Sequence, residues 1–260
     1  MLMFITIAGE LGSGKSTICK LLKEHHGYEI FSTGSIHRRF AEEKALSTIE
    51  LNRLLTDTNE FDNYIDNSVV EFARANAGKR IIFDSRMAWH FVPVSLKVYL
   101  IINPAVAAGR VYATRKTSVE SYPSVAAARA DLIGRKKLED DRFKRLYNAD
   151  CGDYRNYDLV IDSTLAAPDE IVGLITDNGQ WTTDNKGMSE KNNNCQLSTV
   201  NCQLYVSPAN ILPSPRKLAG NPSPLPVTRG SNGRLYTGYY DSVLTARNNG
   251  GTLIKCTMRK

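Results

Sequence analysis

The sequence has no long apolar run. None of its 260 residues belongs to a stretch that approaches the roughly 18 consecutive apolar residues of a membrane-spanning helix. The apolar start, residues 1–8, has no basic segment before it, which a secretory signal peptide requires, and it leads directly into a glycine-rich loop. We therefore expect a soluble, cytoplasmic protein without a membrane partner.

Cysteine is scarce, and its positions show no pairing pattern. The five cysteines are an odd number and are dispersed along the chain, which argues against a disulfide framework and favours reduced thiols. They are Cys19, Cys151, Cys195, Cys202 and Cys256. The four histidines do not stand at metal-ligand spacing from them, so the sequence predicts no resident zinc site.

Runs of basic residues are also missing, although the net charge is +6. Residues 1–178 hold 23 Lys and Arg against 24 Asp and Glu, whereas residues 179–260 hold 10 against 3. This basic C-terminal part permits non-specific contact with nucleic acid. It contains no run of four basic residues, helix-turn-helix or zinc finger that would make such contact specific.

A complete phosphate-binding motif, G-x-x-x-x-G-K-[ST], lies near the start of the chain. An apolar, β-branched run at 4–8 precedes it, and a helical pattern at 16–26 follows it, as such a loop requires. In this arrangement backbone N–H groups and the helix N-terminus bind phosphates, and Lys15 reaches the β and γ oxygens. The predicted ATP-binding residues are Gly9, Glu10, Leu11, Gly12, Ser13, Gly14, Lys15, Ser16 and Thr17.

Strand and helix signals alternate through the first 177 residues, which predicts an α/β fold with a parallel sheet covered on both faces. Strands are expected at 4–8, 28–31, 80–84, 96–102 and 159–162. Helices are expected at 16–26, 35–44, 48–56, 59–77, 104–115, 124–147 and 168–176.

The composition then changes. Residues 178–202 are rich in Asn, Thr, Ser, Gly and Lys, which is typical of a flexible linker. Residues 203–260 are expected to form a small α+β domain with strands at 203–206, 225–228, 234–237 and 252–258 and a helix at 241–248.

Two short polar segments follow the second and third predicted strands. Ser32 and Gly34 lie at the end of the second strand, and Asp84 and Arg86 lie at the end of the third. Open α/β sheets bind ligands at these carboxyl ends. The helix after Gly34 also carries Arg38 and Arg39, whose guanidinium groups suit an acceptor phosphate. We expect Arg38 to be the ligand and Arg39 to be solvated.

A third charged group comprises Arg110, Arg115, Arg135, Glu139 and Arg142. The last three are spaced i, i+4, i+7 and share one face of the long predicted helix. Periodicity alone favours a solvated face with internal ion pairs. Beside a phosphate loop, however, such arginines would stabilise the charge of a phosphoryl group in transfer.

Together these segments resemble the P-loop nucleoside monophosphate kinases, and among them the short cytidylate kinases of the archaeal and bacterial type. The resemblance spans about residues 3–176. It is carried by residues 9–17, 32–38, 83–90, Arg135-x-x-x-Glu139-x-x-Arg142, 147–150 and 157–162. Its most specific part is Asp84-Ser85-Arg86-Met87-Ala88-Trp89.

This resemblance implies a three-layer fold with a five-stranded parallel sheet, a helical acceptor-binding insert and an arginine-bearing lid. It implies that Ser32, Gly34, Arg38 and Arg86 hold the phosphate and ribose side of CMP, and Arg142 the acceptor phosphate. Glu139 would bind the sugar or cytosine, although the family more often has Asp there. Arg110, Arg115 and Arg135 would contact the phosphates in transfer. From the phosphate-loop motif itself, Ser16 is expected to offer its hydroxyl to the Mg²⁺ bound with ATP. Asp84, at the end of the third strand, is expected to order the water shell of Mg²⁺ or to bind the acceptor, with a buried structural role as the alternative.

The C-terminal segment is similar, more weakly, to ParB-like and sulfiredoxin-like domains. The similarity rests on the Pro-rich pattern at 206–227 and on residues 232–238. Tyr239, Tyr240 and Asp241 replace the basic phosphate-binding residues that follow the equivalent of Gly238 in those families. Because ParB-like domains bind CTP, the similarity raises the hypothesis of a coupling to cytidine nucleotides. Tyr236, Tyr239 and Tyr240 could stack on bases, although core or rim positions are commoner for such residues.

The sequence therefore predicts an ATP- and Mg²⁺-dependent kinase that phosphorylates CMP or dCMP. Two alternatives stay open. One is a kinase of the same fold with another small phosphate acceptor. The other is a nucleotide-sensing or DNA-binding regulator that acts through its basic C-terminal region.

Overall fold

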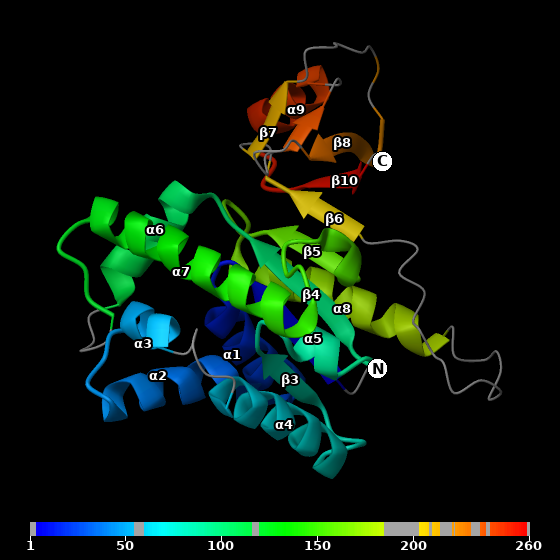
Figure 1. Ribbon diagram of the computed structural model, residues 1–260. Coiled ribbons are helices and arrows are strands. Elements are labelled where there is room, and N and C mark those ends of the chain that lie inside the picture. The colour runs from blue at the N-terminus through cyan, green and yellow to red at the C-terminus, as the bar shows by residue number, and fades with distance from the viewer. Residues whose placement is uncertain are drawn as a thin grey trace.

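The computed structural model describes residues 4–54, 60–115, 120–184, 203–207, 210–213, 220, 222–229, 235–237 and 240–258. At its centre lie five parallel strands in the spatial order β2-β3-β1-β4-β5. Figure 1 labels β3, β4 and β5 of this sheet. The five strands are β1 (Phe4–Gly9), β2 (Glu29–Ser32), β3 (Ile81–Asp84), β4 (Leu96–Ile101) and β5 (Leu159–Asp162). The predicted parallel sheet is thereby confirmed, with strand ends within two residues of the expected ones.

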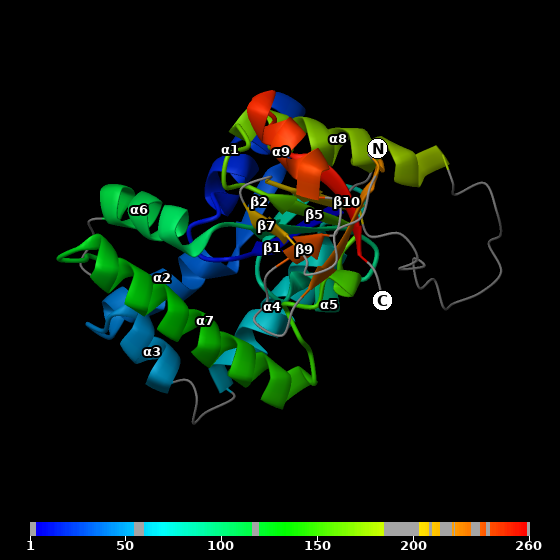
Figure 2. The same cartoon turned by 90° about the horizontal axis from the view of Figure 1, so that it is seen from above.

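Helices cover both faces of this sheet. The helices of this part of the chain are α1 (Lys15–His26), α2 (Thr33–Glu43), α3 (Thr48–Leu54), α4 (Glu60–Ala75), α5 (Ala88–Phe91), α6 (Pro104–Thr114), α7 (Val125–Tyr147) and α8 (Pro168–Asp184). Figure 2 shows α1 and α8 on one side of the sheet and α5 and α7 on the other. Three helices follow β2 without an intervening strand, as predicted.

Alternating side chains of the central strands build a separate core on each face, as strand geometry requires. On the α1 and α8 side, Ile5 and Ile7 pack with Leu22 and Ile175. On the other side, Ala8 belongs to a buried cluster with Met87 and Phe143. These two cores fix the strands whose carboxyl ends carry the predicted site residues.

The sheet does not end at β5. Strand β6 (Gln203–Val206) pairs in parallel with β5, and the sheet continues in the order β6-β10-β8-β9-β7. The added elements are β7 (Ile211–Pro213), β8 (Leu225–Arg229), β9 (Leu235–Thr237), α9 (Tyr240–Asn248) and β10 (Ile254–Met258). Pairing with β6 satisfies the backbone groups that β5 would otherwise expose at a sheet edge. The five-stranded sheet expected from the sequence is thus one part of a larger sheet.

The C-terminal segment also shares a core with the preceding part of the chain. Leu204 and Val206 of β6 belong to the same buried cluster as Tyr157 and Val160. The predicted strands and helix of this segment are present, whereas β7 was not expected. In the earlier part of the chain, the short helix α5 was not expected either. The division into two domains stays a prediction.

Helix α8 is longer than predicted, so residues 178–184, expected to be linker, are helical. Asn178 explains part of this difference. Its Nδ2 donates to the Leu174 carbonyl at 2.7 Å, and its Oδ1 accepts from Gln203 Nε2 of β6 at 2.5 Å. A tertiary contact therefore supports helix where local composition favours a linker. The rest of the predicted linker, 185–202, lies outside the described residues.

Among the described residues, no helix is long and apolar enough to cross a membrane. Cys19, Cys151 and Cys256 are free thiols, all buried. Cys195 and Cys202 lie outside the described part of the chain.

Candidate active site

A cavity of about 520 Å³ lies beside the phosphate loop. The phosphate loop, α2, α4, α6, α7 and the segment after β3 all contribute to its lining. Fifteen of the predicted site residues line it, namely Leu11, Gly12, Gly14, Lys15, Ser16, Thr17, Gly34, Arg38, Asp84, Arg86, Arg110, Arg115, Arg135, Glu139 and Arg142. The structure therefore brings both predicted sides of the site to one cavity. The other predicted site residues, Gly9, Glu10, Ser13 and Ser32, are not part of its lining.

Two positions in the phosphate loop require glycine. A Cβ atom on Gly9, whose φ is +143°, would lie 2.4 Å from the Leu100 carbonyl oxygen of β4. On Gly12, at φ +79°, it would lie 3.0 Å from Ala107 of α6. The loop is thus pressed against β4 and α6 in a conformation that other residues rarely adopt.

The Lys15 amine folds back onto this loop. Its Nζ donates to the Gly9 and Glu10 carbonyls at 2.8 and 2.9 Å. Burial, and next the positive charge of Arg86, lower the pKa of Lys15 to about 8. The carboxylate of Glu10 accepts from the Ile102 N–H at 3.0 Å, so this side chain ties the loop to the end of β4. Glu10 therefore supports the predicted ATP site through its backbone and this anchor.

The acceptor side forms where β2 and β3 end. Ser32 donates its hydroxyl to Asp84 Oδ2 at 3.0 Å and caps α2 by accepting from the Ser35 N–H at 3.4 Å. Asp84 lines the cavity. Arg38 also lines it, whereas Arg39 is 73% exposed and lies 3.8 Å from Glu43. The structure thus places the two arginines differently, and the role of Arg38 as the phosphate ligand stays a prediction.

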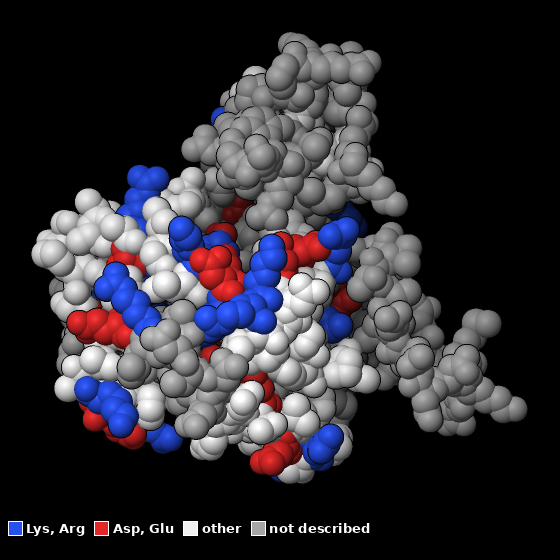
Figure 3. Space-filling model, in the orientation of Figure 1, with Lys and Arg blue, Asp and Glu red and all other residues white. Residues whose placement is uncertain are grey.

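The charged face of α7 is buried. Arg135, Glu139 and Arg142 are each 6% exposed and line the cavity, so the alternative of a solvated face is wrong. Periodicity missed this because charged residues lie on the other faces of α7 as well. In Figure 3, Lys and Arg mingle with Asp and Glu at the centre of the visible face, where Figure 1 places α7.

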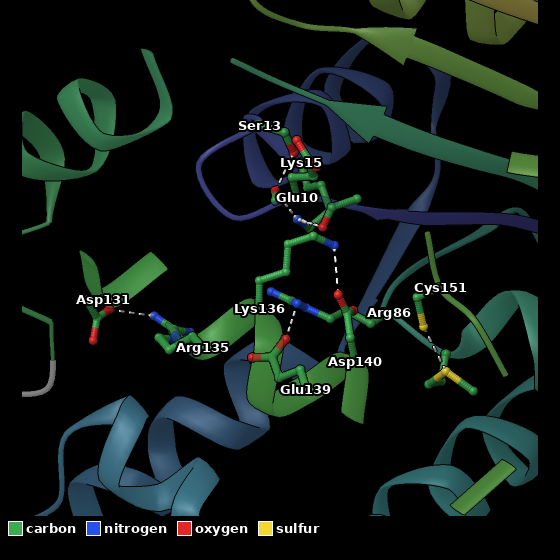
Figure 4. A network of polar contacts seen from close by, with 12 residues as sticks. Glu10, Ser13, Lys15, Arg86, Asp131, Arg135, Lys136, Glu139, Asp140 and Cys151 are labelled. Carbon is green, nitrogen blue, oxygen red and sulfur yellow. Dashed lines mark hydrogen bonds and ion pairs between the residues drawn. The ribbon is translucent and has the colours of Figure 1, made fainter. Parts of the chain in front are cut away.

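Ion pairs organise the arginines of this face. Arg86 is paired with Glu139, as Figure 4 shows. Burial raises the pKa of Glu139, but Arg86, Arg135 and Arg142 outweigh this effect and hold the pKa below its ordinary value. Glu139 is therefore an anion within a cluster of guanidinium groups.

Arg110 lines the cavity from α6, and its guanidinium contacts the turn after β5. Its Nη2 donates to the Ser163 and Thr164 carbonyls, after β5, at 2.9 and 3.3 Å. The resemblance implied a lid contact to the phosphates in transfer. In this structure the guanidinium is held by the turn after β5, and the side chain lines the α6 side of the cavity. Its contact with the phosphates in transfer stays a prediction.

Comparison with known proteins identifies the family of the chain that forms this site. The family model described as "Cytidylate kinase-like family" matches residues 4–165. The chain belongs to the cytidylate kinase-like family. A cytidylate kinase of Methanothrix thermoacetophila is 37% identical over 161 residues, covering 62% of this chain and 88% of that protein. One of Halobacterium salinarum is 32% identical over 177 residues, covering 67% and 88%.

Among solved structures, a shikimate kinase from Bacteroides thetaiotaomicron aligns at 14% identity with a TM-score of 0.45, covering 70% of this chain and 99% of that chain.

The family match ends before β6. The similarity of residues 203–260 to ParB-like domains stays a prediction, as does their contact with nucleic acid. The side chains of Tyr236, Tyr239 and Tyr240, considered for base stacking, lie outside the described part.

In this cytidylate kinase-like chain, three carboxylates of the cavity were not predicted. Asp62 and Asp66 lie one turn apart on α4, and Glu120 lies between α6 and α7. Asp62 Oδ2 is 3.4 Å from Arg142 Nε, and Asp66 accepts a hydrogen bond from Tyr147. The i, i+4 spacing of Asp62 and Asp66 was the available signal.

Glu120 is 3% exposed and binds two arginines. It lies 2.5 Å from Arg135 Nη1 and is also paired with Arg115. Burial raises the pKa of Glu120, but the two arginines prevail and lower it. By contrast, burial raises the pKa of Asp66 to about 6. The cavity therefore contains carboxylates in opposite electrostatic environments.

The residues predicted to meet Mg²⁺ fit that ion. Ser16 and Asp84 supply a hydroxyl and a carboxylate to the same cavity as Lys15, and oxygen donors are what Mg²⁺ prefers. Protein sites commonly hold Mg²⁺ through one or two such oxygens together with substrate phosphates. In the described part of the chain, no cluster of three His, Cys, Asp or Glu side chains could hold a metal by itself.

Proposed function

We propose that this chain transfers the γ-phosphoryl group of ATP to CMP or dCMP, giving the nucleoside diphosphate and ADP. The observation that carries the proposal is the shared cavity. The phosphate loop with Lys15 opens into the same space as Arg38 and Arg86, which follow β2 and β3. The names of the curated relatives and the family match support the same acceptor.

The phosphate loop holds the triphosphate. Its backbone N–H groups and the N-terminus of α1 bind the phosphates, and Lys15 leaves the Gly9 and Glu10 carbonyls to pair with phosphate oxygens. Ser16 and Asp84 hold Mg²⁺, which supplies charge neutralisation to the phosphates when bound. Because Lys15 exchanges two neutral carbonyls for anionic oxygens, its protonated form becomes favoured on binding.

The acceptor phosphate is bound by arginines. Arg38 and Arg86 face the cavity from the ends of β2 and β3, and Arg142 faces it from α7. Their planar guanidinium groups match phosphate oxygens in pairs. Ser32 orients Asp84 and supports the start of α2, while Glu139 holds Arg86 in place.

Transfer needs no covalent intermediate. An oxygen of the acceptor phosphate attacks the γ-phosphorus in line, the new P–O bond forms as the bond to the β-phosphate oxygen breaks, and ADP leaves with that electron pair. Lys15, Arg115 and Arg135 stabilise the negative charge spread over the transferred group. Positioning and electrostatics thus account for the catalysis.

The test is ADP release with CMP, dCMP, UMP, dTMP, AMP and GMP supplied in turn. We expect turnover with CMP and dCMP, and a loss of at least about 100-fold in kcat for Lys15→Met. Lys20→Met is the control, because Lys20 is exposed on α1 and pairs with Glu24. Full activity of a folded Lys15→Met protein would refute the mechanism. Turnover confined to another phosphorylated acceptor would instead support the alternative kinase.

A further inference from the structure

A buried polar cluster joins the C-terminal segment to the turn after β5. At its centre is the carboxylate of Asp162, which has no exposed surface. Its Oδ2 accepts from the Ser207 N–H at 2.9 Å and from Asn210 Nδ2 at 2.7 Å. Its Oδ1 accepts from the hydroxyl of Thr164 at 2.6 Å. Both oxygens of this buried anion are thereby satisfied, one of them entirely by residues that lie after the family match.

Asn210 makes two further contacts in this cluster. Its Nδ2 also donates to Thr164 Oγ1 at 2.9 Å, and its Oδ1 accepts from Asn103 Nδ2 at 3.1 Å. The amide therefore uses its donor group and its acceptor on three different side chains. Asn103 in turn donates its backbone N–H to Thr164 Oγ1 at 2.9 Å. The cluster consequently fixes the ends of β4 and β5 relative to each other.

Two connections lead from this cluster to Arg110. First, Thr164 supplies one of the two carbonyls that accept from the Arg110 guanidinium. Second, Asn103 is the N-cap of α6, on which Arg110 lies, and its Oδ1 accepts from the Ala105 N–H at 2.9 Å. Asn210 thus contacts both the start of the helix that carries Arg110 and the turn that holds its guanidinium.

Arg110 lies at the ATP end of the cavity. Helix α6 flanks the phosphate loop, since Ala107 is the neighbour that a Cβ atom on Gly12 would meet. Arg110, Val111 and Thr114 of the same helix line the cavity. The acceptor arginines Arg38 and Arg142 belong to other elements, α2 and α7.

We propose that Asn210 is a positioning residue for ATP binding and that it acts through Arg110. The identity of the bound nucleotide rests on the proposed function. By this inference the C-terminal segment completes the kinase: it supplies the amide that sets the angle of α6 and the place of the 163–164 turn. The family's own part of the chain offers Asp162 and Thr164 but not this amide.

The first experiment compares Asn210→Ala with Asn249→Ala, an exposed position after α9 in the same segment. Affinity for a non-hydrolysable ATP analogue with Mg²⁺ is measured by calorimetry, and KM for ATP and for CMP by ADP release. We expect Asn210→Ala to raise the analogue Kd and the KM for ATP about three- to tenfold, with the KM for CMP within about twofold of the parent. Asn249→Ala should change none of them.

A double-mutant cycle shows whether the effect passes through Arg110. In an Arg110→Ala background, Asn210→Ala should change the analogue Kd by less than about twofold, because its target is gone. A full additional effect in that background, or equal increases of both KM values in the single variant, would overturn the proposal. So would an Asn210→Ala protein that matches Asn249→Ala.

Asn103→Ser covers the case in which Asn210→Ala does not fold. Serine caps a helix about as well as asparagine, but it has no amide to donate to Asn210. We expect a rise in the analogue Kd in the same direction, and an unchanged Kd would contradict the inference. The outcomes for the two proposals differ. Analogue binding without turnover of any nucleoside monophosphate would refute the proposed kinase, while the binding cycle would still decide the role of Asn210.

Discussion

Glu120 offers a direct measure of how far internal ion pairs stabilise the cavity. It is 3% exposed and is paired with both Arg115 and Arg135, the latter itself 6% exposed. Glu120→Gln keeps the shape and one acceptor but removes the charge. Breaking a buried ion pair from one side leaves an uncompensated charge and costs about 3–5 kcal/mol. Because Arg135 retains Asp131 at 3.9 Å, we expect the lower end, about 3 kcal/mol.

The measurement is the free energy of unfolding from urea titration at pH 7, together with Tm. A loss of about 3 kcal/mol corresponds to a fall in Tm of about 6–12 °C for a chain of this size. Glu43→Gln is the matched control. Glu43 is 62% exposed and lies 3.8 Å from Arg39 on the same helix, a contact worth about 0.3–0.5 kcal/mol.

The difference should depend on pH with a defined sign. The pKa of Glu120 lies below its ordinary value of 4.5 in the folded protein, so the unfolded chain binds its proton first on acidification. The stabilisation by Glu120 is therefore present above pH 4.5 and is lost as the pH falls through the folded-state pKa. Glu120→Gln and the parent should converge in acid. A loss within 1 kcal/mol of that of Glu43→Gln at pH 7 would refute this reasoning.

Three further predictions concern the phosphate loop and the acceptor side. Gly9→Ala should lower the free energy of unfolding in a urea titration by more than about 3 kcal/mol, because its Cβ would meet the Leu100 carbonyl at 2.4 Å. The control is Gly173→Ala in α8, where the Cβ has open space. This variant should be neutral or stabilising by up to about 1 kcal/mol. ATP binding at pH 8 should be accompanied by uptake of as much as about half a proton, because Lys15, whose pKa is about 8, becomes fully protonated against phosphate. Calorimetry in buffers of different ionisation enthalpy measures this proton uptake. Lys15→Met should abolish the uptake. Arg38→Ala should raise the KM for CMP about 10- to 100-fold, and a similar rise in the exposed Arg39→Ala would contradict the assignment.

Much of the site follows from the sequence because its geometry is local or topological. The phosphate loop needs only a strand, a glycine loop and a helix in succession. Asp84 and Arg38 could be placed together because parallel strands deliver their carboxyl ends to one edge, whatever the details of packing. The i, i+4, i+7 spacing likewise fixed a common face for the α7 residues, although burial of that face depended on the cavity.

The remaining features depend on contacts that no local pattern encodes. Glu120 pairs with Arg115 and Arg135, but no local pattern marks a single acidic residue before α7 as the partner of two cavity arginines. Strand β6 was predicted, but its pairing with β5 joins positions more than 40 residues apart across a segment of linker-like composition. Asn210 could not be singled out, since its partners lie on β5, on the turn that follows it, and before α6.

The ion pairs of the cavity also compensate the charge of a site rich in arginine. Arg86, Arg115, Arg135 and Arg142 each lie against a carboxylate, and all of these carboxylates come from outside the phosphate loop. Phosphate oxygens present the same charge and the same acceptor geometry as these carboxylates. We therefore predict that substrate binding exchanges one anion for another, at a smaller cost in free energy than assembling bare guanidinium groups. In Glu120→Gln, Arg115 and Arg135 have already lost the anion that Glu120 provides. Binding of phosphates should therefore stabilise this variant more than the parent.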